Sequence, residues 1–388
     1  WVEAPSATTA RDGLGPLFSA NTCVSCHPSN GRGVLFKNDL PSRSLVARLS
    51  IDSNGSKEHK DILKKDGFIA HDIYGSQLSI NGIHGVPFEG KVKVEFQERI
   101  VKFPDGEIET LLKPKYSLDN LNYGALDDAN ISYRMAPSLN GMPLIELISK
   151  KDILKNIDIE DKNNDGISGK ANFVYSKITN QMELGIYTWK ASVSSLKEQV
   201  ANAAISDMGI TTTIHKNDNC TSFQEECNNA QKSRDKIDLT DERLDAITYY
   251  LKHIKSYSAK RDKKFKEGLE VFEQISCSKC HISSFDTKKG FKVYPYSDFL
   301  LHDMGEELAD GRVEFNASKS EFRTAPLWGL ALHEKINKQK PRLLHDGRAR
   351  TFQEAILWHG GEAEFSKENY MNLPKEKREK LIEFLKGL

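Results

Sequence analysis

The chain carries the spacing Cys-x-x-Cys-His twice, at residues 23–27 and again at 277–281. This spacing is typical of c-type haem attachment, because two cysteine sulfurs can bond to the porphyrin edge while the histidine reaches the iron. A single copy would also suit a zinc or redox site, but two copies that both end in histidine argue against coincidence. We therefore expect two haem c groups. Their attachment residues would be Cys23, Cys26, Cys277 and Cys280, and their axial ligands on one side would be His27 and His281.

Composition excludes several other kinds of function. The 55 basic side chains are balanced by 55 acidic ones, so a net charge of zero argues against nucleic acid or an acidic membrane as the main partner. No run of 18 or more apolar residues occurs, so we expect no transmembrane segment. At 388 residues the chain is long enough for two or three domains.

The remaining cysteines indicate an oxidising compartment. Four of the six cysteines belong to the haem motifs, which leaves Cys220 and Cys227 on either side of a short polar stretch. They could be two free thiols in a loop or a disulfide, and the disulfide is favoured because haem is usually attached outside the cytoplasm. Since the sequence begins at Trp1 rather than Met, we expect a periplasmic protein whose signal peptide has been removed.

A coarse internal repeat predicts the fold class. Apolar residues at helical spacing precede each motif, and a Phe stands five residues before the first cysteine in both copies. Amphipathic helices are predicted at 241–254 and 375–385, one closing each half. We therefore expect a mainly α fold of two cytochrome c-like haem domains, at 1–257 and 258–388, with the charged segment 255–264 at their boundary.

The first domain is predicted to contain a large insertion, at about 30–240. Residues 91–96 alternate with period two, a turn follows at 104–106, and 107–111 resumes the pattern, which predicts a small β-hairpin. Residues 142–154 and 193–205 are predicted to be helical.

His359 is the most informative of the other histidines. Thr351 and Glu354 form a capping-box pattern and Gly360 a stop signal, so His359 ends a predicted two-turn helix. The residues alone leave two interpretations: an iron ligand, or a histidine favoured at the helix C-terminus by the dipole.

Segment 277–361 resembles the C-terminal half of the bacterial di-haem cytochrome c peroxidases. Those proteins place a ligating Met fourteen residues after a histidine that corresponds to His345, and here that position is His359. The resemblance implies that His281 and His359 both ligate the second haem. Paired histidines would give a lower reduction potential than Met and His.

Most of the chain resembles a branch of that superfamily, the di-haem oxidoreductases often labelled "putative peroxidases" or predicted thiol oxidoreductases. The resemblance implies that the first haem reduces hydrogen peroxide or another small oxidant. The second haem would take electrons from a small donor protein of the cytochrome c or cupredoxin type. The matching segments are 23–33, 74–77, 134–141, 165–169, 189–191, 207–210, 301–305, 323–329, 345–348 and 358–362.

The resemblance also suggests the residues around the haems. Gln77 and Glu89 would assist peroxide cleavage, the Glu by moving a proton, although both could be loop residues with structural hydrogen bonds. Candidates for the other face of the first haem are His71, Tyr74 and His84. Further candidates for the haem pockets are His302, His345, Arg348 and Trp189, the last as an electron relay or as packing.

Residues 161–172 suggest a calcium site. Asp161, Asn163, Asp165 and the backbone of Ile167 stand at alternate positions, with Gly166 sixth, as at the start of an EF-hand loop. The twelfth position is Asn172 rather than Glu, so an Asn/Asp-rich turn is the alternative. Calcium between the haems of related peroxidases supports Ca²⁺ as a further cofactor.

Two other functions compete with a peroxidase. The first is an electron-transfer cytochrome with six ligands at both irons and no substrate. The second is an oxygenase or a protein-modifying enzyme, as relatives in the wider superfamily suggest.

Overall fold

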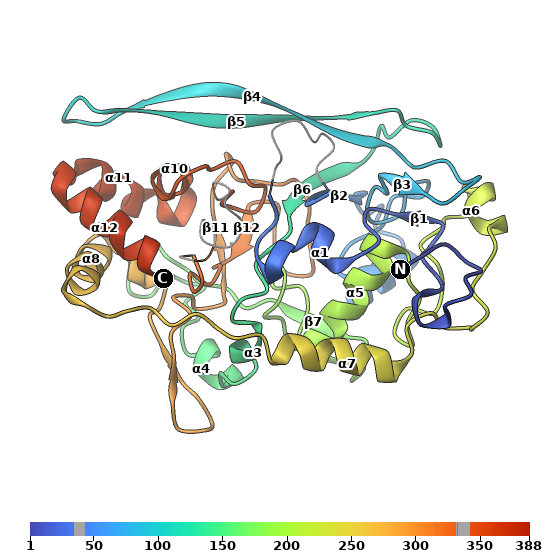
Figure 1. Cartoon of the computed structure of the whole chain (residues 1–388). Coiled ribbons are helices and arrows are strands. Elements are labelled where there is room, and N and C mark those ends of the chain that lie inside the picture. The colour runs from blue at the N-terminus through green and yellow to red at the C-terminus, as the bar shows by residue number, and fades with distance from the viewer. Residues whose placement is uncertain (35–42, 331, 333–341) are drawn as a thin grey trace.

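The chain folds into short helices and small antiparallel sheets (Figure 1). The computed structural model describes residues 1–34, 43–330, 332 and 342–388. Of the described residues 29% are helical and 21% lie in strands, in eleven helices and six small sheets. The prediction of a mainly α fold built from two cytochrome c-like domains is therefore wrong. The long segments between the haem motifs pair with each other as antiparallel ladders, where the prediction had only one small hairpin.

The largest sheet is a long hairpin of β4 (Lys91–Lys102) and β5 (Ile108–Asp119). Its strands pair without interruption from Lys91 opposite Asp119 to Lys102 opposite Ile108. The turn contains Gly106 at a φ of 89°, which a residue with a side chain rarely adopts. The predicted hairpin is confirmed but is longer than expected. It runs along the upper edge of the molecule, above both the N-terminal and the C-terminal parts (Figure 1).

The other sheets each contain two short strands. Leu17 and Phe18, predicted to be helical, form strand β1 instead, because Gly15 and Pro16 interrupt the helical pattern. Gly15 also packs so closely on Gly209 that a Cβ atom would lie 2.4 Å from the Gly209 Cα. The pairs are β1 (Leu17–Phe18) with β3 (Asn81–Gly82), β2 (Leu45–Ser50) with β6 (Asn130–Met135), β7 (Phe173–Ser176) with β8 (Gln181–Leu184), β9 (Phe285–Asp286) with β10 (Lys292–Val293), and β11 (Leu301–Asp303) with β12 (Glu321–Arg323).

Most predicted helices are present with shifted ends. The segment 142–154 forms two helices rather than one, because the chain turns at Ser149, the residue that precedes the second. The helices are α1 (Cys23–Cys26), α2 (Lys57–Asp66), α3 (Met142–Ile145), α4 (Lys150–Leu154), α5 (Leu196–Met208), α6 (Glu225–Asn229), α7 (Asp241–Lys252), α8 (Lys263–Gln274), α10 (Phe352–Trp358), α11 (Glu364–Asn372) and α12 (Lys375–Gly387). Within the described residues, no helix is both long and apolar enough to cross a membrane.

The largest hydrophobic core combines distant parts of the sequence. Phe103 and Leu111 of the hairpin are buried in the same cluster as Phe272, Trp358 and Phe384 of the C-terminal part. Packing therefore crosses the predicted boundary near residue 257. The division into two domains is a statement about independent folding, and it stays a prediction.

Candidate functional site

The first Cys-x-x-Cys-His motif opens onto the wall of a large cavity. Cys23 and Cys26 are the first and last residues of α1, and His27 follows as its C-cap residue. All three line a cavity of about 1200 Å³, with side chains from β2, β6, α5 and α7. This volume is somewhat larger than the roughly 300–1,000 Å³ that small-molecule sites span.

His27 is suited to bind a group that the chain itself does not supply. Burial lowers its pKa, so the imidazole is neutral, which is the form that ligates iron. Its buried Nδ1 has no hydrogen-bond partner within the part of the chain that the structure describes. The free thiols of Cys23 and Cys26, the adjacent cavity and this imidazole together fit a covalently attached haem.

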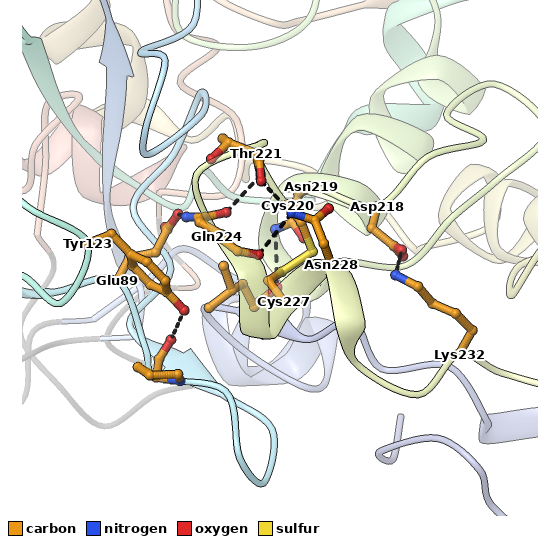
Figure 2. The surroundings of a disulfide bond; sticks show 12 residues. Glu89, Tyr123, Asp218, Asn219, Cys220, Thr221, Gln224, Cys227, Asn228 and Lys232 are labelled. Carbon is orange, nitrogen blue, oxygen red and sulfur yellow. Dashed lines mark hydrogen bonds and ion pairs between the residues drawn. A yellow bond between two sulfur atoms is a disulfide. The ribbon is translucent and has the colours of Figure 1, made fainter.

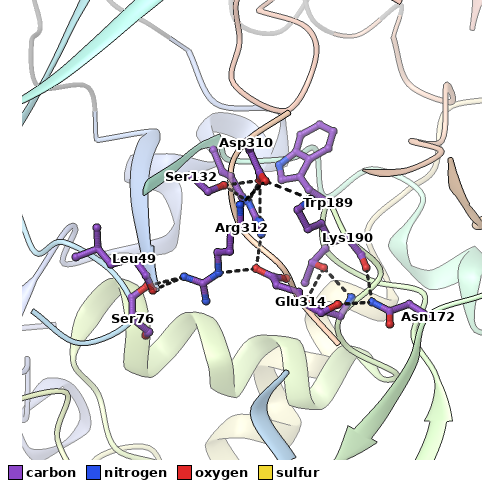
Figure 3. A network of polar contacts seen from close by, with 12 residues as sticks. Leu49, Ser76, Ser132, Asn172, Trp189, Lys190, Asp310, Arg312 and Glu314 are labelled. Carbon is purple, nitrogen blue, oxygen red and sulfur yellow. Dashed lines mark hydrogen bonds and ion pairs between the residues drawn. The ribbon is translucent and has the colours of Figure 1, made fainter. Parts of the chain in front are cut away.

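A buried network of charged side chains (Figure 3) reaches the cavity through Arg134, Arg312 and Glu314, which line it. The Arg134 guanidinium lies 2.9 Å from Asp310 Oδ2 and 2.7 Å from Glu314 Oε1. Arg312 pairs with Glu314 at 3.0 Å and donates to the carbonyl of Leu49. Although burial alone would raise it, Arg134 holds the pKa of Asp310 well below its usual range. Asp310 is therefore ionised beside Arg134.

Positive charge exceeds negative charge in this network. Lys190, which has no exposed surface, lies 3.2 Å from Asp310, so two carboxylates face Arg134, Lys190 and Arg312. Arg48 also lines the cavity and makes no salt bridge with any described residue. A surplus of guanidinium groups suits the two propionate carboxylates of a porphyrin. The sequence did not reveal this wall, since its residues come from four distant segments.

Gln77 is held in one orientation on the cavity wall. Its Nε2 donates to the Ser206 carbonyl and to Asp207 Oδ1, both at 2.9 Å. Because these two oxygens accept hydrogen bonds, the amide cannot be flipped. The Oε1 atom is then a buried acceptor with no partner among the described residues. The sequence indicated Gln77 but not Asp207, whose only signal was its place in a matched segment.

The predicted residues for the other face of the first haem are not all at the cavity. Tyr74 lines it, but its hydroxyl donates to the Gly124 carbonyl at 2.7 Å. His71 and His84 are not among the described residues that line it, and the His71 Nδ1 accepts a hydrogen bond from the Ile73 N–H at 3.1 Å. His84 is exposed.

His215, which the sequence did not single out, does line the cavity. Its Nε2 lies 2.6 Å from Asn202 Oδ1. Burial, with the nearby charge of Lys177, lowers the pKa of His215 to about 4. The imidazole is therefore neutral at physiological pH.

Glu89 lies outside this cavity, beside the disulfide loop (Figure 2). The buried carboxylate accepts hydrogen bonds from the Ser79 N–H and, at 2.5 Å, from Gln224 Nε2. Burial raises the pKa of Glu89 to about 7. Gln224 belongs to the loop closed by the Cys220–Cys227 disulfide, whose Cα atoms are 5.7 Å apart. Glu89 therefore connects the start of the hairpin to this loop, and its catalytic role stays a prediction.

Two histidines, His281 of the second motif and His359, are each oriented by a backbone carbonyl. In His281, which follows the 3₁₀ turn Cys277–Lys279, Nδ1 donates to the Tyr296 carbonyl at 2.8 Å. In His359, the C-cap of α10, Nδ1 donates to the Ala355 carbonyl at 2.6 Å. Burial lowers the pKa of both, and the field of His359 lowers that of His281 further. Each ring is thus neutral and presents Nε2, the arrangement of an iron ligand oriented by a backbone carbonyl.

Two further residues predicted for the haem pockets, His302 and His345, are both buried. His302 lies 3.7 Å from Cys280 Sγ, but both of its ring nitrogens contact carboxylates, so neither is free to bind iron. His345 is buried and stacks on Phe322, with ring centroids 4.2 Å apart. Burial lowers the pKa of His345 to about 4.

Arg348 and Trp189, the other two, are held by protein groups. Arg348 pairs with Asp346 at 2.8 Å and donates to the Glu307 carbonyl. Trp189 lines the first cavity and donates from Nε1 to the Met135 carbonyl at 2.9 Å. Its position is compatible with packing on a porphyrin, and the relay role stays a prediction.

The predicted calcium loop is closed by its own hydrogen bonds. The Asp165 N–H donates to Asp161 Oδ1 at 2.9 Å and to Asn163 Oδ1 at 3.0 Å, and the Ile167 N–H donates to Asp165 Oδ1. The Asp165 carboxylate also lies 2.7 Å from Lys279 Nζ, inside the second haem motif. Across the described ranges no group of three or more His, Cys, Asp or Glu side chains is arranged to hold a metal ion. Calcium binding stays a prediction.

Comparison with known proteins gives one match to a family. The model of a family described as "Di-haem oxidoreductase, putative peroxidase" matches residues 1–388, the whole chain. No curated protein matches it. Among solved structures, a hydrazine synthase of Kuenenia stuttgartiensis, pressurised with 20 bar of xenon, is similar over 66% of this chain and 73% of that chain. Its identity is 14% and its TM-score 0.33, so no argument rests on this likeness.

Proposed function

The chain belongs to the di-haem oxidoreductase family, and we propose that it is a periplasmic enzyme that reduces hydrogen peroxide or a similar small oxidant. In this proposal a small redox protein, of the cytochrome c or cupredoxin type, delivers electrons to the second haem. The oxidant reacts at the first haem, in the cavity beside His27.

The unequal surroundings of the two motifs carry this proposal. At the second motif two neutral histidines, His281 and His359, present Nε2 atoms, which suits an iron with ligands on both faces and a role in electron transfer. At the first motif Tyr74 is hydrogen-bonded to a backbone carbonyl, and His71 and His84 are not among the described residues that line the cavity, so none of the predicted ligands is placed on the other face. This difference supports substrate binding at the first site.

The residues of the first cavity suit a small hydrogen-bond donor. A haem supplies an iron that exchanges single electrons and binds small oxidants. Hydrogen peroxide has two O–H groups, and the unpartnered Oε1 of Gln77 can accept one of them. Asp207 holds that amide in place. Reduction of one peroxide to two waters consumes two electrons, both from the donor protein, and two protons from solvent.

Spectroscopy and turnover of the haem-loaded protein test the proposal. The electron paramagnetic resonance spectra of the oxidised and half-reduced protein would be recorded before and after peroxide. We expect one signal, from the first haem, to change. The variant Gln77→Leu should lower peroxide turnover by about tenfold or more, since a placed hydrogen-bonding group contributes at least that much. Exposed Gln97→Leu is the matched control.

The electron-transfer alternative makes the opposite prediction. Two low-spin signals that do not respond to peroxide, together with equal turnover in Gln77→Leu and Gln97→Leu, would rule out the peroxidase proposal. The chain would then be an electron carrier.

A further inference from the structure

A buried chain of three ionisable side chains lies beside the second haem motif. The His302 Nε2 is 2.8 Å from Asp298 Oδ2, and its Nδ1 is 2.7 Å from Glu362 Oε2. Asp298 and His302 are 2% and 3% exposed, and the Glu362 side chain is 12% exposed, so water screens the Asp298–His302 pair little and reaches only the Glu362 end. His302 follows Leu301 in β11, while Glu362 comes from the segment just after His359.

Hydrogen bonding defines the charge of this chain. A carboxylate only accepts hydrogen bonds, so both ring nitrogens of His302 carry protons and the ring is an imidazolium. Both oxygens of Glu362 also accept from other donors, the N–H and hydroxyl of Ser168 and the N–H of Asp303, at 2.7 to 3.1 Å. Asp298 Oδ1 accepts from the Leu300 N–H at 3.0 Å. One positive and two negative charges leave a net charge of −1.

The chain is attached to the second motif at two points. The His302 Nδ1 is 3.7 Å from Cys280 Sγ, one of the two sulfurs that would bond to the porphyrin. The backbone N–H of Asp298 donates to the Cys280 carbonyl at 2.9 Å. A charge held at this position in a poorly solvated interior acts strongly on the charge of a nearby iron.

We propose that the Asp298–His302–Glu362 chain stabilises the oxidised form of the second haem and thereby lowers its reduction potential. The extra positive charge of ferric iron is favoured by a nearby net negative charge. The three residues would act on the haem only through their charge. Both ring nitrogens of His302 are paired with carboxylates, and none of the three residues lines the first cavity. This effect requires a haem bound to Cys277 and Cys280, as in the proposed function, but it does not depend on which oxidant reacts at the first haem.

Potentiometric titration of the haem-loaded protein, followed by optical spectra at mildly acidic pH, tests this inference. Glu362→Gln and Asp298→Asn each remove one negative charge with little change in shape. Both should raise the potential of the second haem, so that the ferrous-to-ferric ratio at a fixed applied potential rises by roughly tenfold or more. The potential of the first haem should be unchanged.

Two controls separate charge from structure. Ser168→Ala removes a hydrogen bond to Glu362 but keeps its charge, and should shift the potential far less. Asp286→Asn removes a carboxylate whose side chain is 76% exposed, and should have no effect. Local unfolding would admit water, which favours ferric iron and lowers the potential, so it has the opposite sign.

The outcomes are distinct. If Glu362→Gln and Asp298→Asn leave the potential unchanged or lower it, the inference is wrong. Mass spectrometry separately checks that haem is attached at Cys277 and Cys280. If the wild type does not turn over peroxide, the proposed function is wrong, but the reduction potentials of the variants still test the effect of the carboxylates.

Discussion

At the scale of single residues, burial decides which groups are charged around the two motifs. Isolated buried imidazoles such as His27 and His215 have lowered pKa values and are neutral. His302 has two carboxylate partners, and these raise its pKa against the effect of burial. The same residue type is thus neutral in one place and a cation in another.

His215 makes stability depend on pH. Its pKa falls from an ordinary 6.5 to about 4 in the folded chain, so between these values the unfolded state binds more protons. The free energy of unfolding should therefore decrease as the pH falls from about 6.5 to 4, by at most about 3 kcal/mol from this residue. His215→Gln should lack this contribution. Chemical denaturation of both proteins at several pH values measures the difference, and a difference independent of pH would contradict it.

A site residue can be predicted from the sequence when the motif that identifies it lies within one short segment. The two Cys-x-x-Cys-His motifs and His359, with its capping residues, are of this kind. Asp207, Arg48 and His215 reach the cavity from α5, β2 and a loop, and no spacing links them. Glu89, which the resemblance suggested together with Gln77, is not among the described residues that line the cavity, and its catalytic role stays a prediction.

At the scale of elements, the β4–β5 hairpin is the feature that most distinguishes this chain from the predicted plan. Its turn is fixed by Arg378 of α12, which lies 2.6 Å from both Asp105 Oδ2 and Glu107 Oε2. The Arg378 side chain also covers the ring of Phe103 at 4.4 Å. Period-two alternation predicted these strands, but an alternating pattern gives no information about what the far end packs against.

Removing this contact should release the tip of the hairpin. We expect Arg378→Ala to lower the free energy of unfolding by about 2–3 kcal/mol, since a buried guanidinium loses packing and two ion pairs. Amide hydrogen exchange at 103–111 should accelerate. Lys375→Ala is the matched control: Lys375 pairs with the same Glu107 at 3.5 Å but is 63% exposed, so its loss should cost less than about 0.5 kcal/mol. Equal effects of the two substitutions would show that burial of Arg378 is unimportant.

At the scale of the whole molecule, a hydrophobic core and buried ion pairs cross the predicted boundary near residue 257. Besides the core that includes Phe103 and Leu111, the buried pairs of Arg134 with Asp310 and Glu314 join residues more than 170 positions apart. A repeat of two motifs suggested two independent units because sequence similarity reports ancestry and local pattern. It does not report which surfaces are buried together.

The chain should therefore unfold as one cooperative unit. Calorimetry is expected to show a single transition with equal calorimetric and van't Hoff enthalpies. Residues 258–388 expressed alone should be poorly folded, because they lack the hairpin side chains that complete their core. Two separate transitions, or a stable isolated C-terminal fragment, would instead support the division at residue 257.

The contact between the hairpin turn and α12 also constrains how the chain reaches its final state. Asp105 and Arg378 are 273 residues apart in sequence, so the partner of the turn is synthesised long after the turn itself. Phe103 and Leu111 share a buried cluster with Phe272, Trp358 and Phe384, so their core stays incomplete until those segments have been synthesised. Such long-range pairing slows folding and leaves apolar side chains exposed during synthesis. The tip of the hairpin is therefore prone to aggregation until α12 has been synthesised.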